Sequence, residues 1–156
     1  MKESINQYEI AAGERLVDGL AIAVTDGQET SRGGAYLLGF VIEMVLKAAF
    51  FRVRGINPAT PVNLSAIGGA VGKKKFGASD GHNLRLLRDA LIAERLRKGL
   101  GIAPVLRTEL DRRVDRAFAI WSVGLRYDGS PMPDGEVAVM FEDASWVFAQ
   151  RFVLAR

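Results

Sequence analysis

Residues 39–50, which read GFVIEMVLKAAF, constrain the fold of this chain more than any other stretch. Ten of the twelve side chains are apolar or absent, and the two charged residues, Glu43 and Lys47, lie near the middle. A helix that is apolar nearly all round is buried, either among other helices or in a membrane. A glutamate and a lysine near the centre of the segment oppose insertion into a bilayer. The stretch therefore predicts the central helix of a helical protein with no membrane segment.

Helical spacing of apolar residues recurs along the rest of the chain. Near the N-terminus, Ile5, Tyr8, Ala12 and Leu16 follow one another every three or four positions. No long run alternates apolar and polar residues as a half-buried strand does. The predicted helices cover residues 5–26, 31–54, 81–98, 104–127 and 135–156. Because 156 residues suit one domain, we expect a single all-α, up-and-down bundle of about five helices over residues 1–156.

Residues 55–80 form the long connection between the second and third predicted helices. This segment has no clear periodicity, is rich in glycine, and contains the consecutive Lys73, Lys74 and Lys75. Structureless loops of this length are uncommon inside a compact domain, so the segment is either a mobile surface loop or a flap over a site. Its glycines do not have the P-loop spacing, and a second lysine stands where that motif needs a hydroxyl residue. The three lysines can still attract a phosphate as separate positive charges.

Composition narrows the classes of site and of location. The chain has no cysteine and one histidine, which excludes disulfides and thiolate sites and argues against zinc, so we expect no cofactor and no metal. A net charge of +3 permits a phosphate-bearing partner without demanding one. The polar first fifteen residues lack the apolar core of a signal peptide. We therefore expect a cytoplasmic protein.

Glu43 and Lys47 are the polar exception in the central helix. Their spacing of four residues places them on one helix face, in the same stripe as Tyr36 and Phe40. A buried ion pair rarely adds net stability over an apolar pair of similar size. The pair therefore indicates either specificity of packing or a polar site between helices.

His82 lies in the sequence SDGHNLRLL, which predicts the start of the third helix near Gly81, with Ser79 or Asp80 as its N-cap. The positive end of the helix dipole disfavours a charged imidazole in a first turn, so we expect a neutral ring. A neutral histidine can act as a general base or can simply donate one hydrogen bond and pack. Nothing in the local sequence supplies a partner for it.

The segment WSVGLRYDGS holds a second pair of candidates, Arg126 and Tyr127, at the apolar end of the fourth predicted helix. An arginine near a helix C-terminus is favourable to the helix dipole. Alternatively, Arg126 reaches inward and forms a bidentate contact with Glu43 or with a phosphate. Spacing alone does not decide between the two.

Three stretches, AYLLGFVIEMVLKAAFFRVRG, GHNLRLL and WSVGLRY, occur in this order and together resemble the HEPN domains of prokaryotes. The resemblance covers roughly residues 30–150. It implies an all-α up-and-down bundle, association with a nucleotide or nucleic acid, frequent homodimers and, in some members, pairing with a nucleotidyltransferase partner protein.

The ribonuclease members of that family carry an arginine four to six residues before a histidine, and this chain departs from the pattern. Lys75, Phe76 and Gly77 occupy the corresponding positions before His82, which puts metal-independent RNA cleavage in doubt. The positions that carry over from the resemblance are Glu43, Lys47, His82, Trp121, Arg126 and Tyr127.

The resulting expectation is a nucleotide or RNA bound in a polar cleft between helices, without efficient catalysis. Arg126 and Lys47 would contact phosphate, assisted by the three lysines of residues 73–75 and oriented by Glu43. Trp121 or Tyr127 would stack on a base. Two alternatives stay open. One is a ribonuclease of the toxin–antitoxin type with His82 as its base, and the other is a non-catalytic module for dimerisation or protein interaction.

The last predicted helix carries two apolar faces. One stripe consists of Val137, Phe141, Ala144, Phe148 and Phe152. Val139, Trp146 and Val153 form part of the other. One face can pack on the bundle, and the other is left in solvent unless a long connection or the first helix covers it. An apolar surface left in solvent indicates a partner. We therefore expect a homodimer through Val139, Trp146 and Val153.

Overall fold

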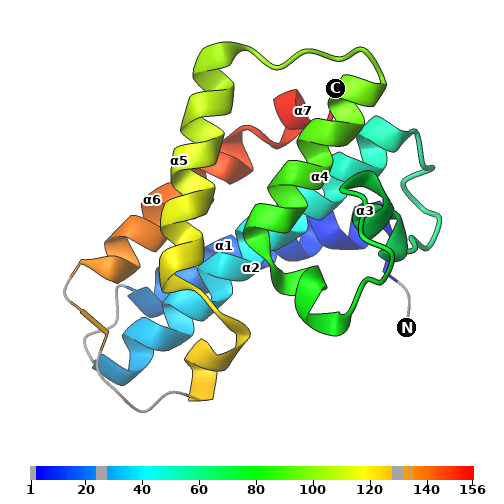
Figure 1. Cartoon of the computed structure of the whole chain (residues 1–156). Coiled ribbons are helices and arrows are strands. Elements are labelled where there is room, and N and C mark those ends of the chain that lie inside the picture. The colour runs from blue at the N-terminus through cyan, green and yellow to red at the C-terminus, as the bar shows by residue number, and fades with distance from the viewer. Residues whose placement is uncertain (1–2, 24–27, 128–131, 134) are drawn as a thin grey trace.

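The structure is a computed structural model that describes residues 3–23, 28–127, 132–133 and 135–156. Within these ranges the chain is all-α, as predicted, and its strand-like pairing is a single bridge between Ser4 and Pro61. Figure 1 shows the helices, which are α1 (Ile5–Ala23), α2 (Gln28–Arg54), α3 (Ser65–Ala70), α4 (Leu84–Arg97), α5 (Pro104–Ile120), α6 (Glu136–Ala149) and α7 (Arg151–Leu154). Two short 3-10 helices are η1 (Ala78–His82) and η2 (Val123–Tyr127).

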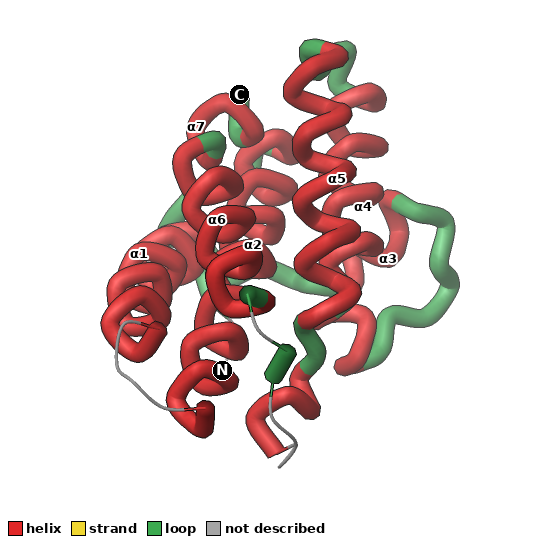
Figure 2. Tube along the Cα trace, turned by 90° about the vertical axis from the view of Figure 1, so that its left-hand side faces the viewer, coloured by secondary structure: helices red, strands yellow, loops and turns green. Residues whose placement is uncertain are grey.

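Helix α2 packs against more of the molecule than any other described helix, as its apolar surface predicts. It contacts α1, α4 and α6, and Figure 2 shows α1 and α6 on one side of it and α4 with α3 on the other. Leu38, Ile42 and Leu46 have no solvent-exposed surface. Residues 32–54 are long and apolar enough to cross a membrane, but most of that segment is buried inside the fold.

The segment expected to be one long loop contains two short helices, α3 and η1. Val62 and Ile67 are buried in the core, and Phe76 packs so closely on Gly68 that an added Cβ there would lie 2.9 Å from its ring. Backbone hydrogen bonds also tie this segment to the N-terminus, from Val62 N to Glu3 O at 2.9 Å. Isolated apolar anchors order the chain here although they have no helical period.

Helix α4 begins later than predicted, and its cap is a different residue. The side chain of Asn83 accepts a hydrogen bond from Leu86 N at 3.0 Å, as an N-cap does. Asp80 instead accepts from Gly77 N at 2.9 Å and closes η1. His82 therefore lies before the cap and outside the helix, not in its first turn.

Helix α5 ends at Ile120, seven residues before the predicted end, because Trp121 turns away to pack on α2. The backbone of Trp121 is extended, and its indole Nε1 donates to the carbonyl oxygen of Tyr36 at 2.9 Å. The indole lies directly against Gly39, where an added Cβ would come within 2.0 Å of it. This long-range contact decides where the helix stops.

The last predicted helix is divided at Gln150 into α6 and α7. The residues of α6 that are fully covered are Met140, Asp143, Ala144 and Val147, so the buried face is shifted from the predicted stripe, of which only Ala144 is buried. Phe152 is 55% exposed and Val153 is 47% exposed. Trp146 is half-buried, and the Arg113 guanidinium lies 5.1 Å from its ring centre.

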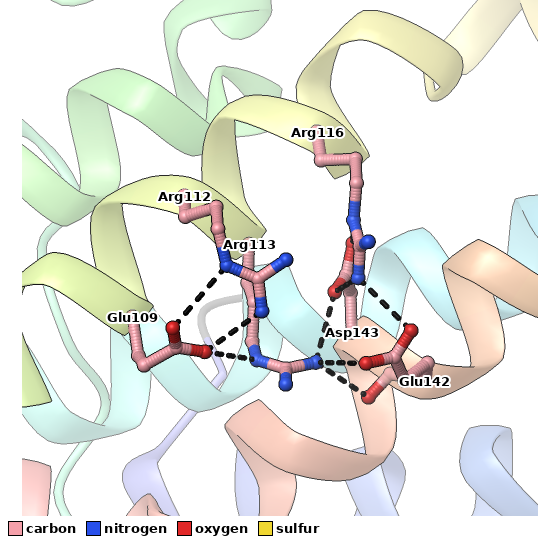
Figure 3. Close-up of polar contacts among 6 residues, drawn as sticks. All are labelled: Glu109, Arg112, Arg113, Arg116, Glu142 and Asp143. Carbon is pink, nitrogen blue, oxygen red and sulfur yellow. Dashed lines mark hydrogen bonds and ion pairs between the residues drawn. The ribbon is translucent and has the colours of Figure 1, made fainter.

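A buried charge joins α5 to α6 (Figure 3). Asp143 has no exposed surface, and its carboxylate accepts from Arg113 at 3.1 Å and from Arg116 Nε at 2.8 Å. Glu142 and Glu109 complete the cluster around the two arginines. Hydrogen bonding to Asp143 raises the pKa of Arg116 above its ordinary value. The two arginines thus supply the ion pairs that a carboxylate buried this deeply requires.

Candidate functional site

The site is built where α2, η1 and the end of α5 meet. Helix α2 supplies Glu43 and Lys47, which are 3% and 4% exposed, and η1 brings His82 over them. Lys47 Nζ donates to Glu43 Oε1 at 2.5 Å, and His82 Nδ1 lies 2.9 Å from Glu43 Oε2. Both carboxylate oxygens of Glu43 are thus engaged, one by Lys47 and the other by His82. The contact between Glu43 and Lys47 was predicted from their spacing. The contact between Glu43 and His82 could not be predicted from spacing.

Lys47 is enclosed by its neighbours. An added Cβ on Gly81 would lie 3.9 Å from Lys47 Nζ, and the ring centre of the buried Tyr8 is 5.7 Å from that nitrogen. Burial and the carboxylate of Glu3, to which its hydroxyl donates at 3.2 Å, raise the pKa of Tyr8. Lys47 therefore balances the charge of Glu43 from within the fold and is not positioned on the surface to receive a phosphate.

The protonation of His82 is set by Glu43. The hydrogen bond to the carboxylate raises the pKa of His82 above 6.5, while burial and the charge of Lys47 act against it. A carboxylate is an acceptor, so Nδ1 carries the proton and the opposite ring nitrogen, Nε2, is directed away from Glu43. The reason predicted for a neutral ring, a helix dipole acting on a residue of the first turn, does not apply, because His82 precedes the helix and meets a buried anion instead.

Two aromatic rings flank the imidazole, which stays partly exposed. The ring centre of Phe40 lies 6.1 Å from that of His82 and 5.4 Å from that of Trp121, both edge to face. His82 and Trp121 themselves are 6.5 Å apart. Tyr36 packs on Phe40 at 4.9 Å and extends the cluster along α2. The predicted stripe of Tyr36, Phe40, Glu43 and Lys47 is therefore one surface of the site.

His82 and Trp121 open onto a cavity of about 640 Å³. Its lining consists of Ala78, Ser79, His82, Asn83, Phe118, Trp121, Ser122 and Val123. The walls are aromatic, and hydroxyl, amide and imidazole groups are spread among them. Such a combination binds a flat, partly polar molecule, because rings supply contact area and polar groups fix orientation.

A second cavity of about 430 Å³ shares Asn83 and Phe118 with the first. Its other lining residues are Val71, Lys73, Arg85, Leu86 and Asp89. The Arg85 guanidinium carbon lies 4.6 Å from the ring centre of Phe118. The two cavities are therefore neighbours of different character, one aromatic and one carrying two cations.

The structure brings together four of the residues chosen from the sequence: Glu43, Lys47, His82 and Trp121. Lys73, Lys74 and Lys75 are exposed, and Lys73 pairs with Asp80 at 2.5 Å beside the second cavity. Arg126 and Tyr127 belong to η2, but their side chains fall outside the described part of the structure.

Sequence reasoning missed Phe118, Asn83 and Arg85. Phe118 precedes Trp121 by three positions, a helical spacing, but the sequence predicts one continuous helix through both residues and gives no sign of a cavity beside them. In the described ranges, no three carboxylate or histidine side chains gather so that they could hold a metal ion.

The chain was compared with known protein families, with curated proteins and with solved structures. No family model matches it, and neither a curated protein nor a solved structure gives a significant match.

Proposed function

We propose that this chain is a HEPN-like bundle that binds a nucleotide or RNA, with one base held in the cavity beside His82. The observation that carries the proposal is the composition of that cavity. Phe118 provides aromatic surface next to an imidazole fixed by a buried carboxylate, in a lining that also includes the largely buried Trp121. Stacking of a base on an aromatic side chain contributes about 1–3 kcal/mol and tolerates different bases.

The charges of the site favour a negatively charged ligand. Glu43 and Lys47 neutralise one another inside the fold, so protonation of His82 leaves the cluster with one net positive charge. Because Glu43 raises the pKa of His82, this charged form persists to higher pH than for a free histidine. The imidazole, rather than Lys47 as first expected, is then the group of this cluster that contacts an anion.

Calorimetric titration with ATP, GTP and a short single-stranded RNA tests the proposal. We expect saturable binding that is lost in Phe118→Ala and His82→Ala. Val105→Ala removes exposed apolar surface at the opposite end of α5 from Phe118 and is the control. Circular dichroism establishes that each variant is folded. Equal affinity in the wild type and the two cavity variants contradicts the proposal.

A second candidate function, RNA cleavage, is favoured by the hydrogen bond between His82 and Glu43. A carboxylate that fixes the ring tautomer is the arrangement that a general base needs. The neutral ring would take the proton of a 2′-hydroxyl on Nε2, and the 2′-oxygen would attack the adjacent phosphorus. The bond to the 5′-oxygen would break, with the proton returned to it, giving a 2′,3′-cyclic phosphate and a 5′-hydroxyl.

The two functions separate in one assay. Cleavage requires the neutral ring, so its rate should rise with pH through the raised pKa of His82 and vanish in His82→Ala. Lys98→Ala, a charge removal at the far end of α4, should cleave like the wild type. RNA that is bound but stays intact in the wild-type protein supports the binding function alone.

The proposed homodimer rests on the exposed C-terminal residues. Val153 is exposed as expected of an interface, together with Phe152, whereas Val139 and Trp146 are half-buried within the protomer. Light scattering coupled to gel filtration should give a dimer for the wild type and a monomer for Val153→Asp. A monomeric wild type contradicts this part of the proposal.

A further inference from the structure

We propose that the second cavity, next to the base site, is a phosphate subsite, so that the ligand is a nucleoside phosphate rather than a nucleoside. This inference rests on the proposed function, because it places the base in the cavity beside His82. The carrying observation is that the two cavities share Asn83 and Phe118, and only the second one is lined by Lys73 and Arg85.

The shared wall defines how a ligand would extend. A base stacked in the first cavity lies on one side of Asn83 and Phe118, and the group attached to it passes these residues into the second. Arg85 already lies over the Phe118 ring at 4.6 Å, so its guanidinium stands at the boundary. An arginine offers two parallel donors to phosphate oxygens, and a lysine adds a compact charge.

Both cations are paired in a way that a phosphate can replace. Lys73 donates to Asp80 at 2.5 Å and Arg85 to Asp115 at 2.7 Å. The side chains of Lys73 and Arg85 are 42% and 49% exposed, and ion pairs so exposed to solvent add little to stability. A dianionic phosphate that contacts both cations therefore competes well with the two separate carboxylates.

One acidic residue, Asp89, also lines the second cavity and opposes an anion there. Arg88 Nε donates to its carboxylate at 2.9 Å, and because Arg88 also pairs with Asp111 and Asp115, it offsets that charge in part. The lining thus holds two cations against one carboxylate that has its own partner outside the lining. The lining residues themselves carry one net positive charge, and a phosphate meets both cations by taking the place of Asp80 and Asp115.

Calorimetry with paired ligands tests the subsite. The probes are the four ribonucleosides and their 5′-monophosphates, titrated into the wild type, Lys73→Ala, Arg85→Ala and Lys98→Ala. Lys98 is an exposed lysine at the end of α4, away from both cavities, and is the charge-matched control. We expect a monophosphate to bind about tenfold tighter than its nucleoside, because its contacts with both cations outweigh the two carboxylate pairs that they replace. That ratio should fall toward one in Lys73→Ala and Arg85→Ala and persist in Lys98→Ala.

The outcomes distinguish this inference from the proposed function. Equal affinity for nucleoside and monophosphate, or a preference that survives in both cavity variants, overturns the phosphate subsite but leaves the base site standing. Binding of none of the eight ligands overturns the subsite together with the nucleotide form of the proposed function. Because Lys73 and Arg85 are exposed, the variants should unfold at the wild-type temperature, and the comparison is free of folding effects.

Discussion

Adding a methyl group at Gly39 tests whether Trp121 lies against α2 as the site requires. The Cβ of an alanine there would be 2.0 Å from Trp121 Cδ1, and a rigid indole packed on a helix backbone cannot give way by a small shift. Trp121 is 3% exposed and would have to leave its place, with its hydrogen bond to Tyr36.

The magnitude follows from two opposing effects. Losing the packing of a buried tryptophan costs about 3–5 kcal/mol, as truncation of such a side chain does. Replacing glycine by alanine in a helix interior returns about 1 kcal/mol. We therefore expect Gly39→Ala to lower the free energy of unfolding by about 2–4 kcal/mol, as measured by urea denaturation. It should also weaken ligand binding, because Trp121 lines the cavity.

Gly13→Ala is the matched control within α1. An added Cβ at Gly13 would meet its nearest neighbour, Phe148, at an ordinary contact distance of 3.8 Å. That variant should be as stable as the wild type or up to about 1 kcal/mol more stable. If Gly39→Ala behaves in the same way as Gly13→Ala, the packing of Trp121 on α2 is refuted, and the cavity argument falls with it.

Asp143→Ala removes the buried partner of Arg113 and Arg116, which keep Glu109 and Glu142, and should cost about 1–3 kcal/mol in chemical denaturation. Asp18→Ala breaks an exposed pair and should change stability by less than about 1 kcal/mol. Equal effects would show that the α5–α6 cluster is not a buried network. For the single histidine, a magnetic resonance titration should give a pKa above 6.5 that falls in Glu43→Gln. The stabilisation from this pair is therefore complete below pH 6.5 and is lost as the pH rises through the raised pKa; an unshifted His82 contradicts the contact.

The all-α class and the burial of α2 followed from the sequence because they depend on local periodicity. A helix with an apolar surface all round must be buried among other helices in a water-soluble fold. The i, i+4 spacing of Glu43 and Lys47 fixes their contact within one helix. Neither inference needs knowledge of distant residues. The same holds for the break after Arg54, where Gly55 adopts a positive φ of 84°.

The rest of the site depended on contacts that no window of sequence contains. The end of α5 is decided by Gly39, about eighty residues earlier, because that glycine admits the indole of Trp121. The pKa of His82 is decided by Glu43, thirty-nine residues away. The segment between α2 and α4 lacked helical period, yet Val62, Ile67 and Phe76 anchor it as three separate apolar contacts. Tertiary packing overrides local pattern in each case.

Asn83 has two roles, because its side-chain oxygen caps α4 and the residue also lines both cavities. The amide hydrogen of Leu86 exchanges with solvent only when this cap opens. A ligand that fastens the Asn83 side chain must therefore slow deuterium uptake at the beginning of α4, by a factor that grows with ligand concentration over its dissociation constant. Deuterium uptake at the beginning of α4 therefore reports whether a ligand occupies the two cavities, without a chemical label on the protein.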